Sequence, residues 1–331
     1  MCGIIGIVSK KQVVDRLLDG LEHLEYRGYD SAGIATINNS EIVYSKSTGK
    51  LVFLKKKLKQ SPIDGNIGIG HTRWATHGEP VELNAHPHVT KNVAVVHNGI
   101  IENFAEFKDG LREKGINFKS QTDTEVIAKL VEEKISKEKR GPLEAVRLTV
   151  EKLRGSFALC FIFRGHENFM VATRRGSPLA LGFGDAENFV SSDALSLSIF
   201  SKKVCYLEEG DLATLTSDEV KIYDSFGNSV LRDIQMLYTD PINLSKGQYK
   251  HFMEKEIFEQ PEVISQVLGY YLNAFEGTLT LPSLPNSKEI ERIILIGCGT
   301  AFYSCLAAKY WFESLSDIPT HAELASEFRY R

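Results

Sequence analysis

Apolar residues follow two different spacings along most of this chain, and each spacing predicts one kind of element. Apolar residues three and four positions apart form one face of a helix, whereas short β-branched runs are typical of buried strands. The first spacing predicts helices over 12–24, 51–58, 100–111, 122–131 and 142–153. The second predicts strands over 3–8, 34–37, 42–44, 67–70, 93–96, 156–163, 169–173, 188–191, 203–207, 211–215 and 219–223. Helices and antiparallel hairpins that cluster separately indicate a layered α+β fold.

The pattern changes near Pro241. Helical spacing runs over 247–268, and the proline-containing stretch 282–286 predicts a linker. An apolar strand, a glycine turn and a helix over 293–315 then form one α/β unit. We therefore expect a first domain, a linker with a helical lead-in and the beginning of a second domain, at 1–240, 241–290 and 291–331.

Composition and charge narrow the classes of protein. The chain has 331 residues, of which 43% are hydrophobic and 25% charged, as in ordinary globular proteins. A net charge of -4 argues against nucleic acid or an anionic membrane as the main partner. There is neither an apolar run of membrane-spanning length nor a basic region that leads into an apolar stretch, so we expect no signal peptide. Five cysteines without a Cys-x-x-Cys pair favour free thiols in a reducing cytoplasm.

The cysteine at position 2 predicts a specific chemistry. Removal of the initiator methionine would leave Cys2 with a thiol and a free α-amine on the same carbon. A thiol with a pKa of about 8.5 is mostly protonated at neutral pH, and an α-amine with a pKa of about 8 can accept its proton. These groups predict an N-terminal nucleophile with a built-in base, held by the buried strand that follows. The alternative is an incidental cysteine at a disordered start.

Four further positions suit a thiol that acts on a free amino acid. Asn98 and Gly99 offer a side-chain amide and a backbone N–H as oxyanion donors, although Asn-Gly is also a strong signal for a plain turn. Arg73 can clamp a carboxylate through two hydrogen bonds, and Asp123 can pair with an ammonium group. The alternatives are a surface ion pair for Arg73 and a helix cap for Asp123.

Two other groups of residues bear on metals and cofactors. Five histidines lie from His71 to His97, but their spacings match no structural zinc site. We therefore expect loop histidines in hydrogen-bond networks and no metal. The turn 297–300 lies between a strand and a helix, where a loop can bind phosphate at the helix N-terminus. Phe302 occupies the position where a dinucleotide fingerprint requires glycine, which argues against NAD, and we expect no cofactor.

Several longer motifs resemble one known family. The segments 2–4, 25–33, 71–78, 97–99 and 122–125 are similar to the glutamine–fructose-6-phosphate aminotransferases, and the similarity extends from Met1 to Arg331. The segments 249–261, 297–300 and 325–331 resemble the linker helix and the opening of the sugar isomerase domain in that family. These motifs are long and specific, so together they outweigh the plainer interpretations of each position.

The resemblance implies an N-terminal nucleophile amidotransferase fold, an αββα sandwich in which two antiparallel sheets lie between helix layers. It implies that Cys2 attacks the glutamine side-chain amide and releases ammonia, with Asn98 and Gly99 as the oxyanion hole. Trp74 would stand where the family gates its ammonia channel, and Arg27 would flank the nucleophile. The residues around the glutamine would be Arg73, Thr76, His77 and Asp123.

The same resemblance implies a second domain that binds fructose 6-phosphate through Gly299 and Thr300 and forms glucosamine 6-phosphate. The sugar-isomerising residues of the family have no counterparts before Arg331, so we expect a truncated isomerase domain and a chain that alone is only a glutaminase. The full-length protein is expected to be a cytoplasmic homodimer without nucleic-acid or membrane partners. The alternatives are a non-catalytic regulatory remnant of that enzyme, or another N-terminal cysteine amidotransferase such as an amidophosphoribosyltransferase or an asparagine synthetase.

Overall fold

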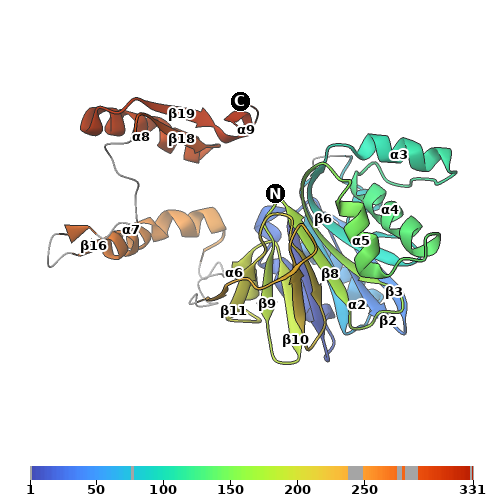
Figure 1. Cartoon of the computed structure of the whole chain (residues 1–331). Coiled ribbons are helices and arrows are strands. Elements are labelled where there is room, and N and C mark those ends of the chain that lie inside the picture. Colours follow the sequence, from blue (N-terminus) through green and yellow to red (C-terminus); the bar gives the residue numbers. More distant parts are fainter. Residues whose placement is uncertain are drawn as a thin grey trace. The chain divides into compact units, whose positions relative to one another are not determined.

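The structure is a computed structural model that describes residues 2–75, 78–237, 249–273, 278–279, 290–328 and 330. The chain forms two compact units, Met1–Gly247 and Gln248–Arg331 (Figure 1). Among the described residues, no helix combines the length and the apolar character that crossing a membrane requires.

The first unit contains two antiparallel sheets, and the larger of them carries the N-terminus. Its strand order is β15-β11-β9-β10-β1-β4-β2-β3. The strands are β1 (Gly3–Ser9), β2 (Ser31–Asn38), β3 (Glu41–Thr48), β4 (Ile67–Arg73), β9 (Ala180–Phe183), β10 (Glu187–Ser191), β11 (Lys203–Tyr206) and β15 (Ile234–Met236). The strand β1 is therefore flanked on both sides, by β10 and by β4.

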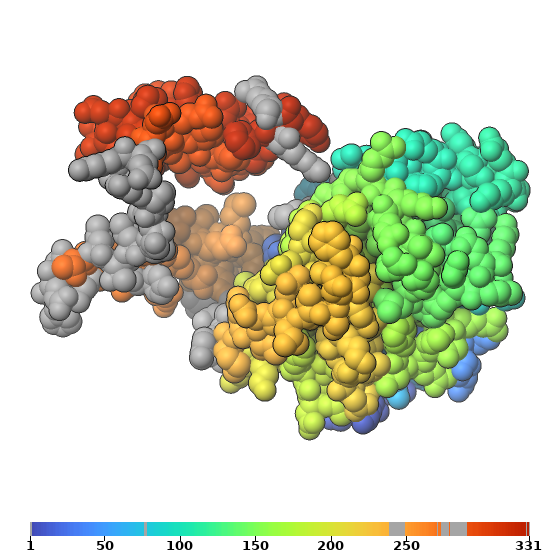
Figure 2. All heavy atoms as spheres, viewed as in Figure 1, coloured from blue at the N-terminus to red at the C-terminus, as the bar shows by residue number. Residues whose placement is uncertain are grey.

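The second sheet of this unit has the strand order β14-β13-β12-β8-β7-β6-β5. Its strands are β5 (His88–Val89), β6 (Val93–Ile101), β7 (Gly155–Phe163), β8 (Met170–Arg175), β12 (Leu212–Leu215), β13 (Val220–Tyr223) and β14 (Ser229–Val230). The strands β14 and β15, which come last in the sequence of this unit, lie at the surface. Figure 2 shows this part of the chain in gold.

Helices cover the outer face of each sheet. The helices α1 (Val14–Glu22) and α2 (Leu51–Gln60) pack on the larger sheet, and their apolar faces are buried against it. The helices α3 (Phe104–Glu113), α4 (Thr124–Ser136) and α5 (Pro142–Val150) pack on the smaller sheet and lie together on one side of the unit (Figure 1). The described part of the unit also contains three short helical turns, η1 (Glu25–Arg27), η2 (Glu82–Asn84) and α6 (Ala194–Leu197).

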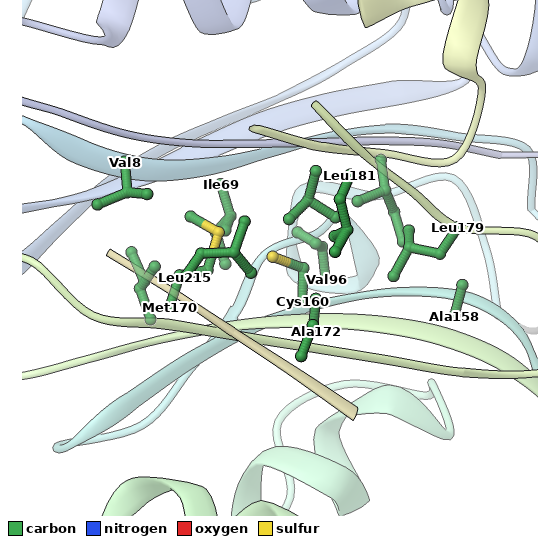
Figure 3. Close-up of a cluster of buried hydrophobic side chains, with 14 of the residues drawn as sticks. Val8, Ile69, Val96, Ala158, Cys160, Met170, Ala172, Leu179, Leu181 and Leu215 are labelled. Carbon is green, nitrogen blue, oxygen red and sulfur yellow. The ribbon is translucent and has the colours of Figure 1, made fainter. Parts of the chain in front are cut away.

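An apolar core fills the space between the two sheets. Side chains of β1 alternate, so Ile4 belongs to this core, while Ile5 and Ile7 pack under α1 and α2. A Cβ at Gly6 would lie 2.9 Å from Met170 Sδ, which shows how closely the sheets approach there. Figure 3 shows side chains from both sheets meeting in this core, among them Val8, Ile69, Leu181, Val96, Cys160 and Met170. Burial on both faces explains why β1 is an unbroken apolar run.

The predicted fold class is confirmed, since two antiparallel sheets lie between two layers of helices. The two predicted hairpins are formed by β2 with β3 and by β12 with β13. Several strands are longer than their apolar runs predict. The strands β2 and β3 extend at both ends, β4 continues to Arg73, and β6 continues to Ile101. The strand β9 is missing from the prediction, because its sequence Ala-Leu-Gly-Phe contains no β-branched residue.

The second unit begins, in its described part, with the long helix α7 (Phe252–Tyr271) and the short strands β16 (Leu272–Asn273) and β17 (Thr278–Leu279). The predicted strand-turn-helix unit is formed by β18 (Ile293–Gly297) and α8 (Thr300–Ser316). The strand β19 (Thr320–Leu324) then pairs in parallel with β18, and α9 (Ala325–Phe328) follows. The predicted linker at 282–286 lies outside the described residues.

Candidate active site

Cys2 lies directly before β1, at the end of a strand that has neighbours on both sides. Side chains fix the beginning of this strand. The Ile4 N–H donates to Ser192 Oγ at 2.9 Å, and Ser191 Oγ donates to the Ile4 carbonyl oxygen at 3.0 Å. The segment that carries Cys2 is therefore tied to the sheet.

The Cys2 thiol lies against the backbone of Trp74, the residue that follows β4. The Trp74 N–H donates to Cys2 Sγ at 3.2 Å, and Sγ lies 3.5 Å from the Trp74 carbonyl oxygen. Burial raises the pKa of the Cys2 thiol, and the hydrogen bond with the Trp74 backbone offsets part of this rise. A thiol with a raised pKa requires a base to form the nucleophilic thiolate.

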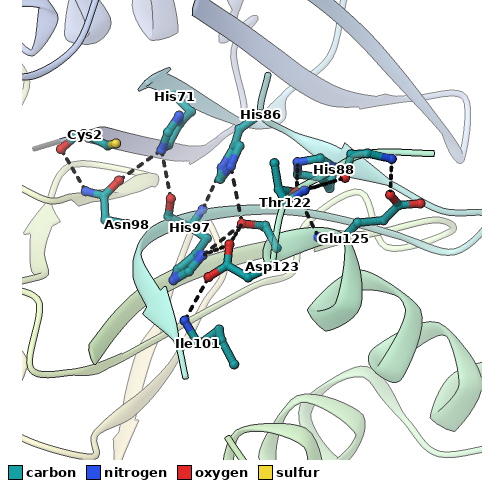
Figure 4. Close-up of polar contacts among 12 residues, drawn as sticks. Cys2, His71, His86, His88, His97, Asn98, Ile101, Thr122, Asp123 and Glu125 are labelled. Atoms are coloured by element: carbon teal, nitrogen blue, oxygen red, sulfur yellow. Dashed lines mark hydrogen bonds and ion pairs between the residues drawn. The ribbon is translucent and has the colours of Figure 1, made fainter. Parts of the chain in front are cut away.

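Asn98 and Gly99 lie in β6 of the smaller sheet. Figure 4 shows Asn98 beside Cys2, and Gly99 lines the same cavity as Cys2. Asn98 Nδ2 donates to the Cys2 carbonyl oxygen at 2.9 Å. Both residues pair in register with β7, so the plain-turn interpretation of this Asn-Gly pair is wrong. Gly99 has a φ of 125°, and a Cβ there would lie 2.0 Å from the Ser156 carbonyl oxygen. Glycine alone fits this position without displacing β7.

A small cavity beside the thiol brings together five of the nine residues predicted for the glutaminase site, namely Cys2, Arg73, Trp74, Gly99 and Asp123. It is lined by Cys2, His71, Arg73, Trp74, His86, His97, Gly99, Thr122, Asp123 and Thr124. A thiol, a glycine backbone, a cation and an anion thus line one space. These are the groups that a zwitterionic amino acid would need beside a thiol.

The two charged residues of the cavity are buried, with 4% of Arg73 and 5% of Asp123 exposed. Arg73 is therefore not part of a surface ion pair; its Nη1 donates to the Glu79 carbonyl oxygen at 3.3 Å. Asp123 stands at the N-cap position of α4 but makes no side-chain capping bond. Its Oδ2 instead accepts a hydrogen bond from the Ile101 N–H at 2.8 Å, which ties α4 to the end of β6.

Four histidines form a buried array at the cavity, His71, His86, His88 and His97 (Figure 4). The rings of His71 and His86 stack with centroids 4.2 Å apart, and His86 meets His88 edge to face at 5.0 Å. His88 Nε2 lies 2.9 Å from Thr122 Oγ1. The predicted hydrogen-bond networks are thus present, although His71, His88 and His97 lie in strands and not in loops. In the part of the chain that the structure describes, no cluster of His, Cys, Asp or Glu is arranged to hold a metal ion.

The histidine array predicts a loss of stability in mild acid. Burial lowers the pKa of His71 to about 3 and the pKa values of His86 and His88 well below their usual value of 6.5. Below pH 6.5 the unfolded chain therefore binds protons that the folded chain does not, so the free energy of unfolding falls as the pH falls. Each histidine contributes about 1.4 kcal/mol per pH unit. Urea unfolding between pH 7 and pH 5 measures how the free energy of unfolding depends on pH. His88→Gln should reduce the number of protons taken up on unfolding by about one. A free energy of unfolding that does not change with pH would contradict neutral histidines in the folded array.

Four predicted glutaminase-site residues are not among the described residues that line the cavity. One is Asn98, whose Nδ2 donates to the Cys2 carbonyl oxygen. Thr76 and His77 lie outside the described residues. Arg27, the last residue of η1, forms an ion pair with Asp193 at 2.9 Å and donates from Nε to the Tyr26 hydroxyl at 2.8 Å. Arg27 is not among the cavity-lining residues of the described chain. Its predicted position beside the nucleophile stays a prediction.

Gly299 and Thr300, the predicted phosphate-binding residues, belong to the second unit. Gly299 has a φ of 58° and precedes α8, whose first residue is Thr300. The turn therefore connects β18 with the N-terminus of a long helix, which is the local geometry that the sequence predicts. Phosphate binding there stays a prediction.

The sequence does not single out the groups that hold the site residues in position. His71 Nε2 lies 3.0 Å from Asn98 Oδ1, across 27 residues of sequence. Asp30 accepts a hydrogen bond from the Ala75 N–H, 45 residues away, and so holds the chain just after Trp74. A polar residue such as His71 inside a buried strand is the one local signal of such a contact.

Comparisons with known proteins identify the domain that contains the cavity. The family described as "Glutamine amidotransferase domain" matches residues 71–198. The chain carries a glutamine amidotransferase domain. The family described as "SIS domain" matches residues 288–331, which include β18, α8 and β19 of the second unit. Both matches agree with the predicted resemblance.

Curated relatives align with this chain over its full length at about 50% identity. The chain is 49% identical to the glutamine–fructose-6-phosphate aminotransferase (isomerizing) of Brucella suis biovar 1 (strain 1330) and 51% identical to that of Bartonella quintana (strain Toulouse). Each alignment covers 100% of this chain and 54% of the relative. The chain thus spans about half the length of the curated relatives it matches, and the predicted resemblance is confirmed.

Two solved structures share the fold of the amidotransferase domain. The glutamine phosphoribosylpyrophosphate amidotransferase from B. subtilis, complexed with ADP and GMP, matches with a TM-score of 0.61 and 20% identity over 98% of this chain and 65% of that chain. An allosteric regulatory enzyme of purine biosynthesis matches with a TM-score of 0.59 and 24% identity over 69% of this chain and 50% of that chain. At these identities the likeness shows the fold alone, and it confirms the predicted N-terminal nucleophile amidotransferase fold.

Proposed function

We propose that this chain hydrolyses the side-chain amide of glutamine, with Cys2 as the nucleophile. The observation that carries the proposal is the shared cavity, in which the Cys2 thiol, the Gly99 backbone, Arg73 and Asp123 meet. The amidotransferase match and the names of the relatives support the same chemistry. No cofactor takes part in the reaction as proposed.

The first half of the reaction forms a thioester. The α-amine of Cys2, free once Met1 is removed, takes the thiol proton, and the thiolate attacks the amide carbon of glutamine. A C–S bond forms while the carbonyl oxygen becomes an oxyanion. Asn98 Nδ2 and the Gly99 N–H stabilise this negative charge.

The second half releases both products. The C–N bond breaks as the ammonium of Cys2 returns a proton to the leaving nitrogen, so that ammonia departs. A water molecule then attacks the thioester carbon, with the α-amine as its base. Breaking the C–S bond gives glutamate and restores the Cys2 thiol.

The two buried charges fix the position of the glutamine. Arg73 pairs with the α-carboxylate and Asp123 with the α-ammonium, since both residues line the cavity. The family resemblance implies that Thr76 and His77 lie around the same substrate. Opposite charges on a ligand would complement these two buried charges. The cavity therefore favours a free amino acid over a simple amide.

Arg73→Lys is expected to raise KM for glutamine by about 10-fold or more, because lysine keeps the charge but loses the planar fork that binds two carboxylate oxygens. Steady-state glutamate release measures the effect. Arg112→Lys is the matched control, since Arg112 is exposed on α3 and its ion pair with Asp109 lies at the surface. A KM unchanged from wild type in Arg73→Lys would remove Arg73 from carboxylate binding.

We infer that the complete protein passes this ammonia to fructose 6-phosphate and forms glucosamine 6-phosphate. The names of the relatives and the SIS domain support this acceptor. Trp74, half exposed at the mouth of the cavity, would gate the ammonia, Arg27 would flank the nucleophile, and Gly299 with Thr300 would bind the sugar phosphate. A homodimer and a cytoplasmic location, in keeping with five free cysteines, belong to the same proposal.

Glutamate and ammonia measured separately from the purified 331-residue chain test the proposal. Equal amounts of both are expected from glutamine, with little change when fructose 6-phosphate is added and no amino sugar. The reason is that the chain spans about half of the relatives. A chain that binds glutamine without releasing glutamate would be the non-catalytic remnant, and stoichiometric amino sugar would show that the isomerising residues lie within these 331 positions. Stimulation by another ammonia acceptor would favour a different N-terminal cysteine amidotransferase.

A further inference from the structure

The amide of Asn98 is held at both of its ends (Figure 4). Asn98 Nδ2 donates to the Cys2 carbonyl oxygen at 2.9 Å. At the other end, Asn98 Oδ1 lies 3.0 Å from His71 Nε2. His71 Nε2 also lies 3.0 Å from the His97 carbonyl oxygen. Two backbone carbonyls therefore bracket the pair of side chains.

These two carbonyls determine which atoms carry hydrogen. A carbonyl oxygen only accepts, so the His97 carbonyl requires a proton on His71 Nε2. A protonated Nε2 in turn requires an acceptor on Asn98, which is its oxygen. The Cys2 carbonyl requires a donor, which is the Asn98 NH2 group. Only one orientation of the amide and one tautomer of the imidazole satisfy all three contacts.

This orientation has a consequence for the oxyanion. The NH2 group has two hydrogens, of which one is used by the Cys2 carbonyl, so the other stays available for the developing negative charge. If the amide turned by 180°, Oδ1 would face both the Cys2 carbonyl oxygen and the oxyanion. It would then repel the charge that Asn98 is proposed to stabilise.

We propose that His71 is a positioning residue for glutamine hydrolysis, which holds the Asn98 amide with its NH2 group toward the oxyanion site by donating from Nε2 to Asn98 Oδ1. The proposal rests on the proposed function of Asn98. The His71 ring is 1% exposed, is fixed by stacking on His86, and its buried Nδ1 has no hydrogen-bond partner in the described chain. All of its hydrogen-bonding capacity is thus directed at Asn98 and at the backbone of β6.

The chemistry of the ring fits this role. Burial lowers the pKa of His71 to about 3, so the imidazole stays neutral with its single proton at Nε2. A doubly protonated ring would place a charge beside the oxyanion hole and would have to donate from Nδ1, which has no acceptor. Because the imidazole stays neutral near neutral pH, the hydrogen bond from His71 Nε2 to Asn98 Oδ1 is kept there.

A set of variants tests the inference through kcat and KM for glutamate release. His71→Leu removes the donor and is expected to lower kcat by about 10- to 100-fold, with KM changed less than about threefold. The loss stays below the roughly 100- to 1000-fold expected when an oxyanion donor is removed outright, as in Asn98→Ala. His71→Gln is expected to recover most of kcat, because its side-chain nitrogen is as many bonds from Cβ as Nε2. His166→Leu, at an exposed position far along the chain, is the control that keeps wild-type rates.

The double variant His71→Leu/Asn98→Ala separates positioning from general damage. If His71 acts only through Asn98, the double variant is no slower than Asn98→Ala. The inference would be overturned if the losses of kcat in the two single variants multiplied in the double variant. It would also be overturned by a wild-type kcat in His71→Leu, or by a folded His71→Gln whose kcat does not recover. Nitrogen-15 NMR of His71 provides a readout that does not depend on activity, with a proton expected on Nε2. A proton on Nδ1 would overturn the inference even if the wild-type chain released glutamate, whereas failure of wild type to release glutamate would count against the proposed function alone.

Discussion

Replacing Cys2 with alanine is expected to lower kcat for glutamine hydrolysis by at least about 10⁴-fold, because the remaining groups can stabilise an oxyanion but cannot form the thioester. Binding should survive, since Arg73 and Asp123, which line the same cavity, are proposed to hold the two ends of the substrate. Glutamate release measures the loss, and isothermal titration with glutamine measures the retained affinity. Residual turnover within 10-fold of wild type would place the nucleophile elsewhere.

The matched control for this variant is Cys305→Ala. Cys305 is a free, partly buried thiol in α8 of the second unit. Unlike Cys2, it is not among the residues that line the cavity. We expect this control to keep wild-type kcat and KM. A similar loss in both variants would point to a general effect of removing thiols.

Replacing Gly99 with alanine is expected to remove activity by about 100-fold or more and to destabilise the fold. The φ of 125° strains any side chain by about 1–3 kcal/mol. The new Cβ would also lie 2.0 Å from the Ser156 carbonyl oxygen, so β6 and β7 must separate. This movement displaces the Gly99 N–H and Asn98, the two proposed oxyanion donors. Denaturant unfolding and glutamate release measure the two effects.

Gly110→Ala is the matched control for the glycine variant. Gly110 lies inside α3, and nothing lies within 4 Å of the position that its Cβ would occupy. Alanine in a helix interior is favoured over glycine by about 1 kcal/mol, so this variant should gain stability and keep its activity. If Gly99→Ala behaved in the same way, the close approach of β6 and β7 would not matter for the site.

The layers of the fold can be predicted from the sequence because their periodicity is local. Strands such as β1 are apolar on both faces, and helices such as α2 carry apolar residues three and four apart, so each pattern is visible in one short segment. The order of the strands is not visible in the same way. β1 lies between β10 and β4, and the pairing with β10 joins segments more than 170 residues apart.

The chemistry of the candidate site can be predicted only in part. Cys2 follows the initiator methionine, and Arg73 and Asp123 carry opposite charges that suit a free amino acid; all three line one cavity. Asn98 and Gly99 are more ambiguous, because Asn-Gly is typical of a turn until the pairing of β6 with β7 is known. His71 could not be assigned a role, since its effect on Asn98 depends on a contact between two different sheets.

The most direct test of the central claim is to label the nucleophile with a glutamine analogue that carries a diazoketone in place of the side-chain amide. The purified 331-residue chain is treated with the analogue, and peptide mapping by mass spectrometry locates the adduct while glutamate release is followed. We predict one equivalent bound to the sulfur of Cys2, on a peptide that begins at Cys2, with parallel loss of activity and protection by glutamine. Label on another residue, or full activity after labelling of Cys2, would contradict the account.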